Sequence, residues 1–197
     1  MPDGANHVAF AYSADGKDRF TTVYPNLNLL EGSKKYTKDN PKIVSSSNPD
    51  NAVYVGDVSV KNLKAGTYTM SGKADAPWTA HYENVANREG KVGLWLVGTK
   101  PEMDVNISLG DTVPKTIEVP KDGDYNVRVN TYSNGTDVAT HSFSDFKLEP
   151  GSTATPYMPS SSEATVEDYP SYIGSYTDNK STEQSTNPDR YKWEKIG

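Results

Sequence analysis

The sequence predicts an all-β protein, with a two-sheet jelly-roll sandwich inserted into a small β module made from both chain ends. Helical periodicity is nearly absent, and short alternating runs recur between Gly, Pro, Asn and Asp residues. Seven or eight such runs in the middle of the chain suit two packed sheets. Tyr24-Pro25 and Tyr169-Pro170 mark where the smaller module is interrupted and where it resumes.

The expected strands are bounded by turn residues. They are 7–12, 53–60, 66–74, 91–98, 103–109, 115–119, 124–132, 138–148, 171–177 and 190–196. The Asn134-Gly135 pair favours the positive φ of a tight hairpin, so 124–132 and 138–148 are expected to be antiparallel neighbours. Residues 33–52 are expected to form a loop, and Phe143, Phe146 and Leu148 are the apolar positions of the last central strand.

Four segments follow from these borders. They are residues 1–25 and 169–197 as the two halves of a connector module, 26–149 as the jelly roll and 150–168 as a linker. Three prolines and the Ser/Thr-rich composition of 150–168 predict an extended linker. In the connector, alternation is expected to place Val8 and Phe10 against aromatic residues of the C-terminal half.

Composition argues against several classes of function. The net charge is −6 and no Lys/Arg cluster exceeds a pair, whereas nucleic-acid binding needs a basic footprint. No apolar run approaches the ~18 residues of a membrane span. Without cysteine there is neither a disulfide nor a thiolate metal site. We therefore expect no nucleic-acid or membrane partner.

The candidate ligand site comes from strand alternation. If Leu94, Leu96 and the valines of 124–132 form the core, the opposite sheet face presents Trp95, Asn126, Arg128, Asn130 and Tyr132. An aromatic ring suits the apolar face of a sugar, and amide or guanidinium groups suit its hydroxyls. The alternative is that Trp95 belongs to the core of the opposite packing, with Gly93 and Val97.

Trp78 and Tyr82 are two further candidates. They lie on or beside a loop between strands, where a ligand contact or a satellite aromatic over a sheet edge is equally consistent with the pattern.

Catalytic signatures are weak, so a non-enzyme is expected. The three histidines are scattered, and no metal, nucleophile-elbow or phosphate-loop motif is present. Asp104, Asp111, Asp122 and Asp124 lie on strand ends and turns of the expected pattern, where solvated carboxylates are common. His141 lies near Asp145 in sequence, and a surface pair explains it better than a catalytic one.

The chain also resembles a known family. Lys147-Leu-Glu-Pro-Gly-Ser-Thr-Ala-Thr-Pro-Tyr-Met-Pro-Ser and Phe20-Thr-Thr-Val-Tyr-Pro-Asn-Leu-Asn-Leu-Leu resemble the borders of carbohydrate-binding jelly rolls in tail and baseplate proteins of phages infecting lactic acid bacteria. The ends, Ala9-Phe-Ala-Tyr-Ser-Ala-Asp-Gly, Tyr172-Ile-Gly-Ser-Tyr-Thr-Asp and Asn187-Pro-Asp-Arg-Tyr-Lys-Trp, are similar to a short module of the same proteins.

The resemblance implies non-catalytic binding of cell-wall polysaccharide of a Gram-positive host, at an exposed place on the virion tail tip or baseplate. It also implies contacts with other tail or baseplate proteins and an oligomer such as a trimer. The alternatives are a structural spacer or trimerisation module of a tail fibre and, more weakly, a glycan-cleaving enzyme. Jelly rolls of this kind often hold a structural calcium, for which Glu31 and Asp145 are the candidate ligands, although calcium takes about six to eight oxygens. No other cofactor is expected.

Overall fold

A computed structural model describes residues 4–80, 84–180 and 182–197. The chain is all-β, which confirms the predicted class: three antiparallel sheets hold the strands of the described residues. It divides into two compact units. We call residues 27–163 the central unit, and residues 1–26 with 164–197 the end unit.

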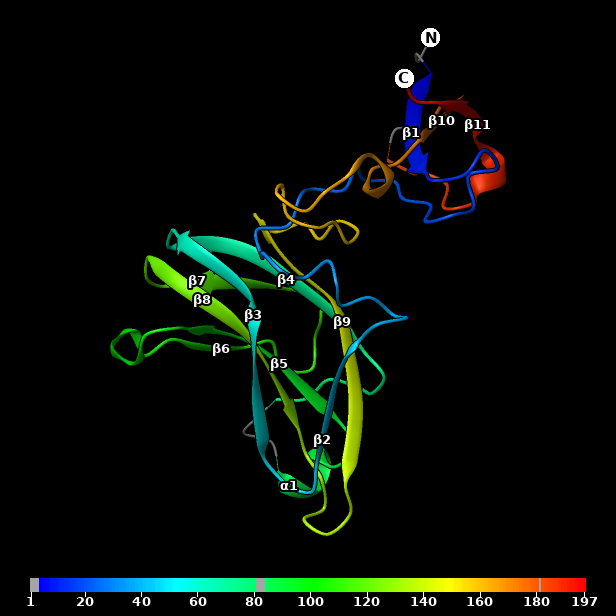
Figure 1. Cartoon of the computed structure of the whole chain (residues 1–197). Helices are drawn as coiled ribbons and strands as arrows, with labels where there is room; N and C mark the ends of the chain where they lie inside the picture. The colour runs from blue at the N-terminus through cyan, green and yellow to red at the C-terminus, as the bar shows by residue number, and fades with distance from the viewer. Residues whose placement is uncertain (1–3, 81–83, 181) are drawn as a thin grey trace. The chain divides into compact units, whose positions relative to one another are not determined.

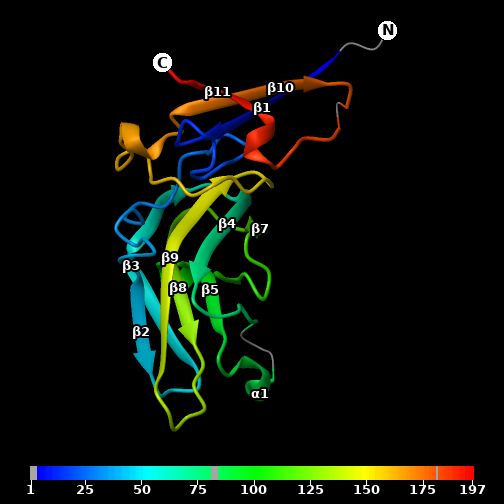
Figure 2. The same ribbon diagram turned by 90° about the vertical axis from the view of Figure 1, so that its right-hand side faces the viewer.

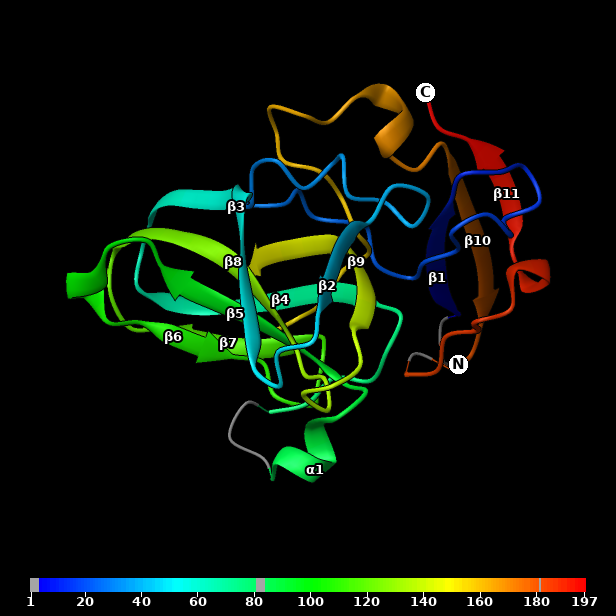
Figure 3. The ribbon, with the colours of Figure 1, turned by 60° about the horizontal axis from the view of Figure 1, so that its bottom comes forward.

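Two four-stranded sheets form the β-sandwich of the central unit (Figure 1). The strands are β2 (Lys42–Ser46), β3 (Asn51–Leu63), β4 (Gly66–Ala74), β5 (Val92–Gly98), β6 (Asn106–Ser108), β7 (Lys115–Val119), β8 (Gly123–Thr131) and β9 (Ala139–Pro150). One sheet has the order β3-β8-β5-β6, which can be followed in Figure 3. The other has the order β2-β9-β4-β7, and Figure 2 shows β9 beside β4.

The two sheets bury one apolar core between them. Alternation turns Leu94 and Leu96 of β5 inward, together with Val127 and Val129 of β8, as the sequence predicts. The second sheet contributes residues such as Met70, Phe143, Phe146 and Leu148, all fully buried. Each fully buried side chain of this kind stabilises the fold by about 1.5–3 kcal/mol.

Strand β2 lies where a loop was expected. It pairs with β9 from Lys42–Phe143 to Ser46–Ala139. Val44 is its buried residue, whereas Ile43 is exposed. A short edge strand with one inward side chain shows almost no alternation, and its pairing comes from the partner strand.

The predicted hairpin between 124–132 and 138–148 is wrong. Strand β8 belongs to one sheet and β9 to the other. Gly135 does adopt a positive φ of 86°. However, the Asn134 side-chain oxygen accepts hydrogen bonds from the backbone N–H groups of Thr136 and Asp137. This Asx-type turn belongs to a longer connection that carries the chain from one sheet to the other.

A bulge in β9 explains its uneven apolar spacing. The pairing with β4 shifts between Ser71–Lys147 and Lys73–Ser144. Asp145, inside this interval, has a φ of 55°. The extra residue changes the alternation, so Phe143 and Phe146 both face the core although three positions separate them.

The segment expected to be a linker is instead held against the central unit as far as Glu163. The backbone N–H of Asn28 donates to the Pro159 carbonyl over 3.1 Å. The Lys147 ammonium donates to the Pro156 carbonyl over 2.6 Å. A composition rich in Pro, Ser and Thr does not reveal these contacts, because the groups that hold the segment lie on earlier strands.

The end unit contains the three-stranded sheet β1-β10-β11 (Figure 1). Its strands are β1 (Ala5–Ala11), β10 (Tyr172–Asp178) and β11 (Lys192–Lys195). Strands β1 and β10 pair from Ala5–Asp178 to Ala11–Tyr172. The expected pairing of the two chain ends is therefore present.

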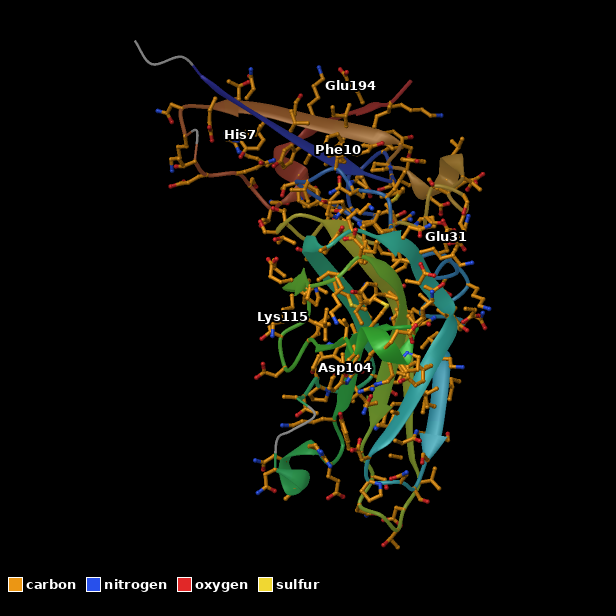
Figure 4. The ribbon with its side chains drawn as sticks, turned by 90° about the vertical axis from the view of Figure 1, so that its left-hand side faces the viewer. His7, Phe10, Glu31, Asp104, Lys115 and Glu194 are labelled. Atoms are coloured by element: carbon orange, nitrogen blue, oxygen red, sulfur yellow. The ribbon has the colours of Figure 1, made fainter. Side chains whose placement is uncertain are left out.

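The buried face of β1 is the opposite of the one expected. His7, Ala9 and Ala11 are buried, whereas Val8 is exposed and Phe10 partly exposed; His7 and Phe10 are labelled in Figure 4. The His7 ring stacks on Tyr176 with centroids 4.6 Å apart. Small residues are needed on this side because a Cβ at Gly174, the partner of Ala9, would lie 2.8 Å from the Trp193 ring.

In the part of the chain that the structure describes, helical structure is limited to short turns. They are α1 (Val85–Arg88), η1 (Pro101–Met103), η2 (Val166–Asp168) and η3 (Pro188–Arg190). No helix in the described ranges is long and apolar enough to cross a membrane.

Candidate functional site

The outer face of the sheet β3-β8-β5-β6 contains most of the predicted site residues. The alternation that buries Leu94 and Val127 turns Trp95 and Arg128 to the other side. Across the ladder, Tyr54 of β3 pairs with Arg128, and Arg128 pairs with Trp95 of β5. We call Tyr54, Arg128 and Trp95 the aromatic–arginine row.

Arg128 is half-buried between the two rings of this row. Its guanidinium carbon lies 4.2 Å from the Trp95 ring centroid and 6.0 Å from that of Tyr54. Its Nε donates to Asn130 Oδ1 over 3.2 Å, and Asn130 Nδ2 donates to Asp50 Oδ1 over 3.4 Å. Cation–π contact and this hydrogen bond together fix the guanidinium in place.

Trp95 is not the open stacking surface that the sequence suggested. Only 7% of it is exposed, and Asn130 and Tyr132 are buried as well. The Arg128 guanidinium lies over the indole. A Cβ at Gly93 would lie 3.3 Å from Trp95 Nε1 and 3.1 Å from the Tyr132 hydroxyl. The absence of a side chain at Gly93 thus lets the indole and the phenol both lie close to the backbone at this position.

Tyr54 presents an exposed ring on the outer face, and it is not among the site residues predicted from the sequence. It is 57% exposed, between Val53 and Val55, whose side chains face the core side of β3. The alternation of β3 could have predicted this position, because a tyrosine between two valines in a strand faces away from them.

A cavity of about 510 Å3 opens beside Tyr54. Asn126 is the predicted site residue that lines it. Asp104, which follows η1 and is labelled in Figure 4, is another lining residue. The described residues that line it are Tyr54, Gly98, Thr99, Lys100, Pro101, Asp104, Val105, Asn106 and Asn126.

Tyr132 is part of the buried end of the outer face. The guanidinium carbon of Arg88, on α1, lies 4.8 Å from the Tyr132 ring centroid. Burial, followed by the charge of Asp50, raises the pKa of Tyr132 to about 12, against the opposing effect of Arg88 and Arg128. The phenol therefore keeps its proton at neutral pH, and two arginines bring positive charge to this part of the sheet.

Trp78 lies away from the aromatic–arginine row. It forms a bridge with Val92, at the start of β5, and packs against the core with its ring 6.2 Å from that of Phe143. This position matches the satellite aromatic over a sheet edge. Tyr82 lies outside the described residues.

The proposed calcium ligands have separate partners. Glu31 accepts hydrogen bonds from Ser160 and Ser162, and Asp145 pairs with Lys73 over 3.3 Å. His141 pairs with Asp75 over 3.0 Å. Within the described ranges, no group of three or more His, Asp or Glu side chains is placed to hold a metal ion.

Among known proteins, the chain is similar to a solved phage structure. It is entitled the tripod (BppUct-A-L) from the baseplate of bacteriophage Tuc2009. The match covers 100% of this chain and 80% of that one, with a TM-score of 0.58 and 25% sequence identity. No family model and no curated protein matches the sequence. The likeness supports a phage tail or baseplate role.

Proposed function

We propose that this chain is a non-catalytic saccharide-binding module of a phage tail or baseplate adhesion protein, directed at cell-wall polysaccharide of a Gram-positive host. The observation that carries the proposal is the exposed ring of Tyr54 at the edge of a polar cavity, beside Arg128, in a chain that matches a baseplate protein along its whole length.

The chemistry of this place suits a sugar. Tyr54 offers an open aromatic ring for the C–H face of a pyranose. Asn126 uses one amide N–H for the Gly56 carbonyl, which leaves its side-chain oxygen as an acceptor among the described contacts. Asn106, Thr99 and Asp104 add further donors and acceptors around the same cavity.

Binding is favoured over cleavage by the composition of the cavity. Glycosidases generally use two carboxyl groups that flank the scissile bond. Among the described residues that line this cavity, Asp104 is the single carboxylate. Assays of reducing ends released from purified cell-wall polysaccharide test this part of the proposal.

The affinity of one site is expected to be modest, with a Kd on the order of micromolar to millimolar, because sugar hydroxyls must shed water that the protein only partly replaces. A baseplate presents many copies, and linked copies raise the effective affinity. The tripod in the name of the matching structure supports an oligomer, such as a trimer, and contacts with other tail proteins.

A fluorescent fusion of the whole chain tests the function. We expect it to label cells of a susceptible Gram-positive host, and Tyr54→Ala and Asn126→Ala to reduce labelling without lowering Tm. Tyr24→Ala, which removes an exposed tyrosine of the end unit, is the matched control and should label normally. If the unmodified fusion labels no host, a structural spacer becomes the better description.

A further inference from the structure

The guanidinium of Arg128 has donors to spare. A guanidinium carries five N–H donors in a fixed plane. The hydrogen bond of this group within the described chain is the one from Nε to Asn130, and it forms no ion pair there. The terminal amino groups of a half-buried cation are therefore available to a ligand.

The surroundings of Arg128 balance its charge incompletely. The rings of Trp95 and Tyr54 attract a cation at their faces, but they offer no lone pairs to N–H groups in the guanidinium plane. Asp50 is reached only through Asn130. In the neighbouring cavity Lys100 and Asp104 carry opposite charges, so Arg128 decides the charge preference.

We infer that the saccharide bound at this face carries an anionic group, a carboxylate or a phosphate, which Arg128 holds through its terminal N–H groups. Both anions match the planar fork of a guanidinium and accept two parallel hydrogen bonds from it. The neutral part of the ligand then lies against Tyr54. This inference rests on the proposed function and defines the chemical class of its ligand.

The net charge of the chain restricts how an anionic saccharide can be bound. At −6, the protein as a whole repels polyanions. Recognition of an acidic saccharide must therefore come from a local, partly desolvated contact, where charge-assisted hydrogen bonds are strongest.

The test compares one polysaccharide in three forms. Cell-wall polysaccharide purified from a susceptible host is titrated into the full chain untreated, after reduction of its carboxyl groups to alcohols, and after cold hydrofluoric acid treatment to cleave its phosphodiesters. Concentrations are counted per repeating unit. We expect one treatment to weaken binding roughly tenfold or more, the loss typical of a hydrogen bond to a charged group. The effective treatment identifies the anion as carboxylate or phosphate.

Variants connect the anion to Arg128. Arg128→Gln should weaken binding of the untreated polysaccharide by a similar factor and leave binding of the neutralised form unchanged. Arg128→Lys should bind the untreated polysaccharide with an affinity between those of the unmodified chain and Arg128→Gln, because it keeps the charge and loses the planar fork. Lys64→Gln removes an exposed cation of the same unit and should bind like the unmodified chain. Thermal melts verify that each variant folds.

Two outcomes overturn the inference, and they are distinguishable. Equal binding of untreated and neutralised polysaccharide removes the anionic group and leaves saccharide binding intact. Absence of binding to every form, together with no labelling of host cells, removes the proposed function as well.

Discussion

Lys147 and Arg128 of the central unit differ in burial and in the groups that surround their charges. Lys147 is fully buried, and its ammonium donates to Thr155 Oγ1 over 2.8 Å and to the Pro156 carbonyl, with Glu149 3.4 Å away. Arg128 is half-buried and has no carboxylate beside it in the described chain. The Lys147 ammonium uses its hydrogen-bond donors within the fold and stabilises it, whereas the Arg128 guanidinium has N–H groups left for a ligand.

Replacing Lys147 should be costly. Lys147→Met leaves Glu149 buried without its cation, so we expect a loss of about 3–5 kcal/mol in the free energy of unfolding, measured by chemical denaturation. Lys64→Met is the control, because Lys64 and Asp122 form an exposed pair, worth about 0–1 kcal/mol. Equal losses in the two variants would contradict this account of Lys147.

The same lysine predicts a pH dependence. Burial, opposed by Glu149, lowers the pKa of Lys147 from 10.5 to about 8. Between these values the unfolded chain binds more protons than the folded one, so this group makes the free energy of unfolding rise with pH, by at most about 1.4 kcal/mol per pH unit. The difference in free energy of unfolding between the unmodified chain and Lys147→Met should widen from pH 8 to pH 10. A difference in free energy of unfolding that stays constant from pH 8 to pH 10 would refute the lowered pKa of Lys147.

Tyr54 and Trp95 should respond to truncation in opposite ways. Trp95 is nearly buried under Arg128, so Trp95→Ala should cost roughly 3–5 kcal/mol of stability and lower Tm. Tyr54→Ala should leave Tm almost unchanged and reduce cell labelling, because its ring is exposed. Melting curves recorded beside labelling assays separate the two roles, and a Trp95→Ala variant with unchanged Tm would show that its ring is accessible.

At the scale of elements, β9 and the segment that follows it act together. The bulge at Asp145 turns Phe146 and Leu148 into the core and places Lys147 and Glu149 on the outer side of the sheet. Residues 151–157 then cover these two charges: Thr155 donates to Glu149 through both its N–H and its hydroxyl. The segment resembling phage jelly rolls, Lys147 to Ser160, is therefore a structural closure of the sandwich.

This closure predicts where the central unit can be cut. Residues 27–163 should unfold cooperatively as an isolated chain, because they hold their own core. A chain ending at residue 149 exposes Lys147 and Glu149 and should be markedly less stable. Urea denaturation of both chains checks this, and equal midpoints would mean that residues 150–163 contribute nothing.

At the scale of the whole molecule, the likeness to a baseplate tripod covers both units. The end unit pairs strands from both ends of the chain, whereas the face that we propose to bind saccharide lies on the central unit. If that division holds, residues 27–163 alone should retain binding of host polysaccharide, measured by the same titration as the full chain. Loss of binding in a folded 27–163 chain would place the site elsewhere.

The sequence by itself determined the all-β class, most strand positions and the sheet face that carries Arg128, because alternation is a local property of the chain. The pairing of the chain ends followed from neither half being able to bury its apolar residues alone. Alternation also places Tyr54 on this outer face, but only the structure shows that its ring is exposed.

Only the tertiary structure decided which partner each strand takes and what covers each face. Strand β8 pairs with β3 and β5 instead of β9, and β2 is a strand because β9 lies beside it. Trp95 is buried because Arg128 stacks on it and Gly93 leaves room, and β1 turns Ala9 inward because Trp193 occupies the space above Gly174. These outcomes depend on side chains far apart in the sequence, and local periodicity contains no information about them.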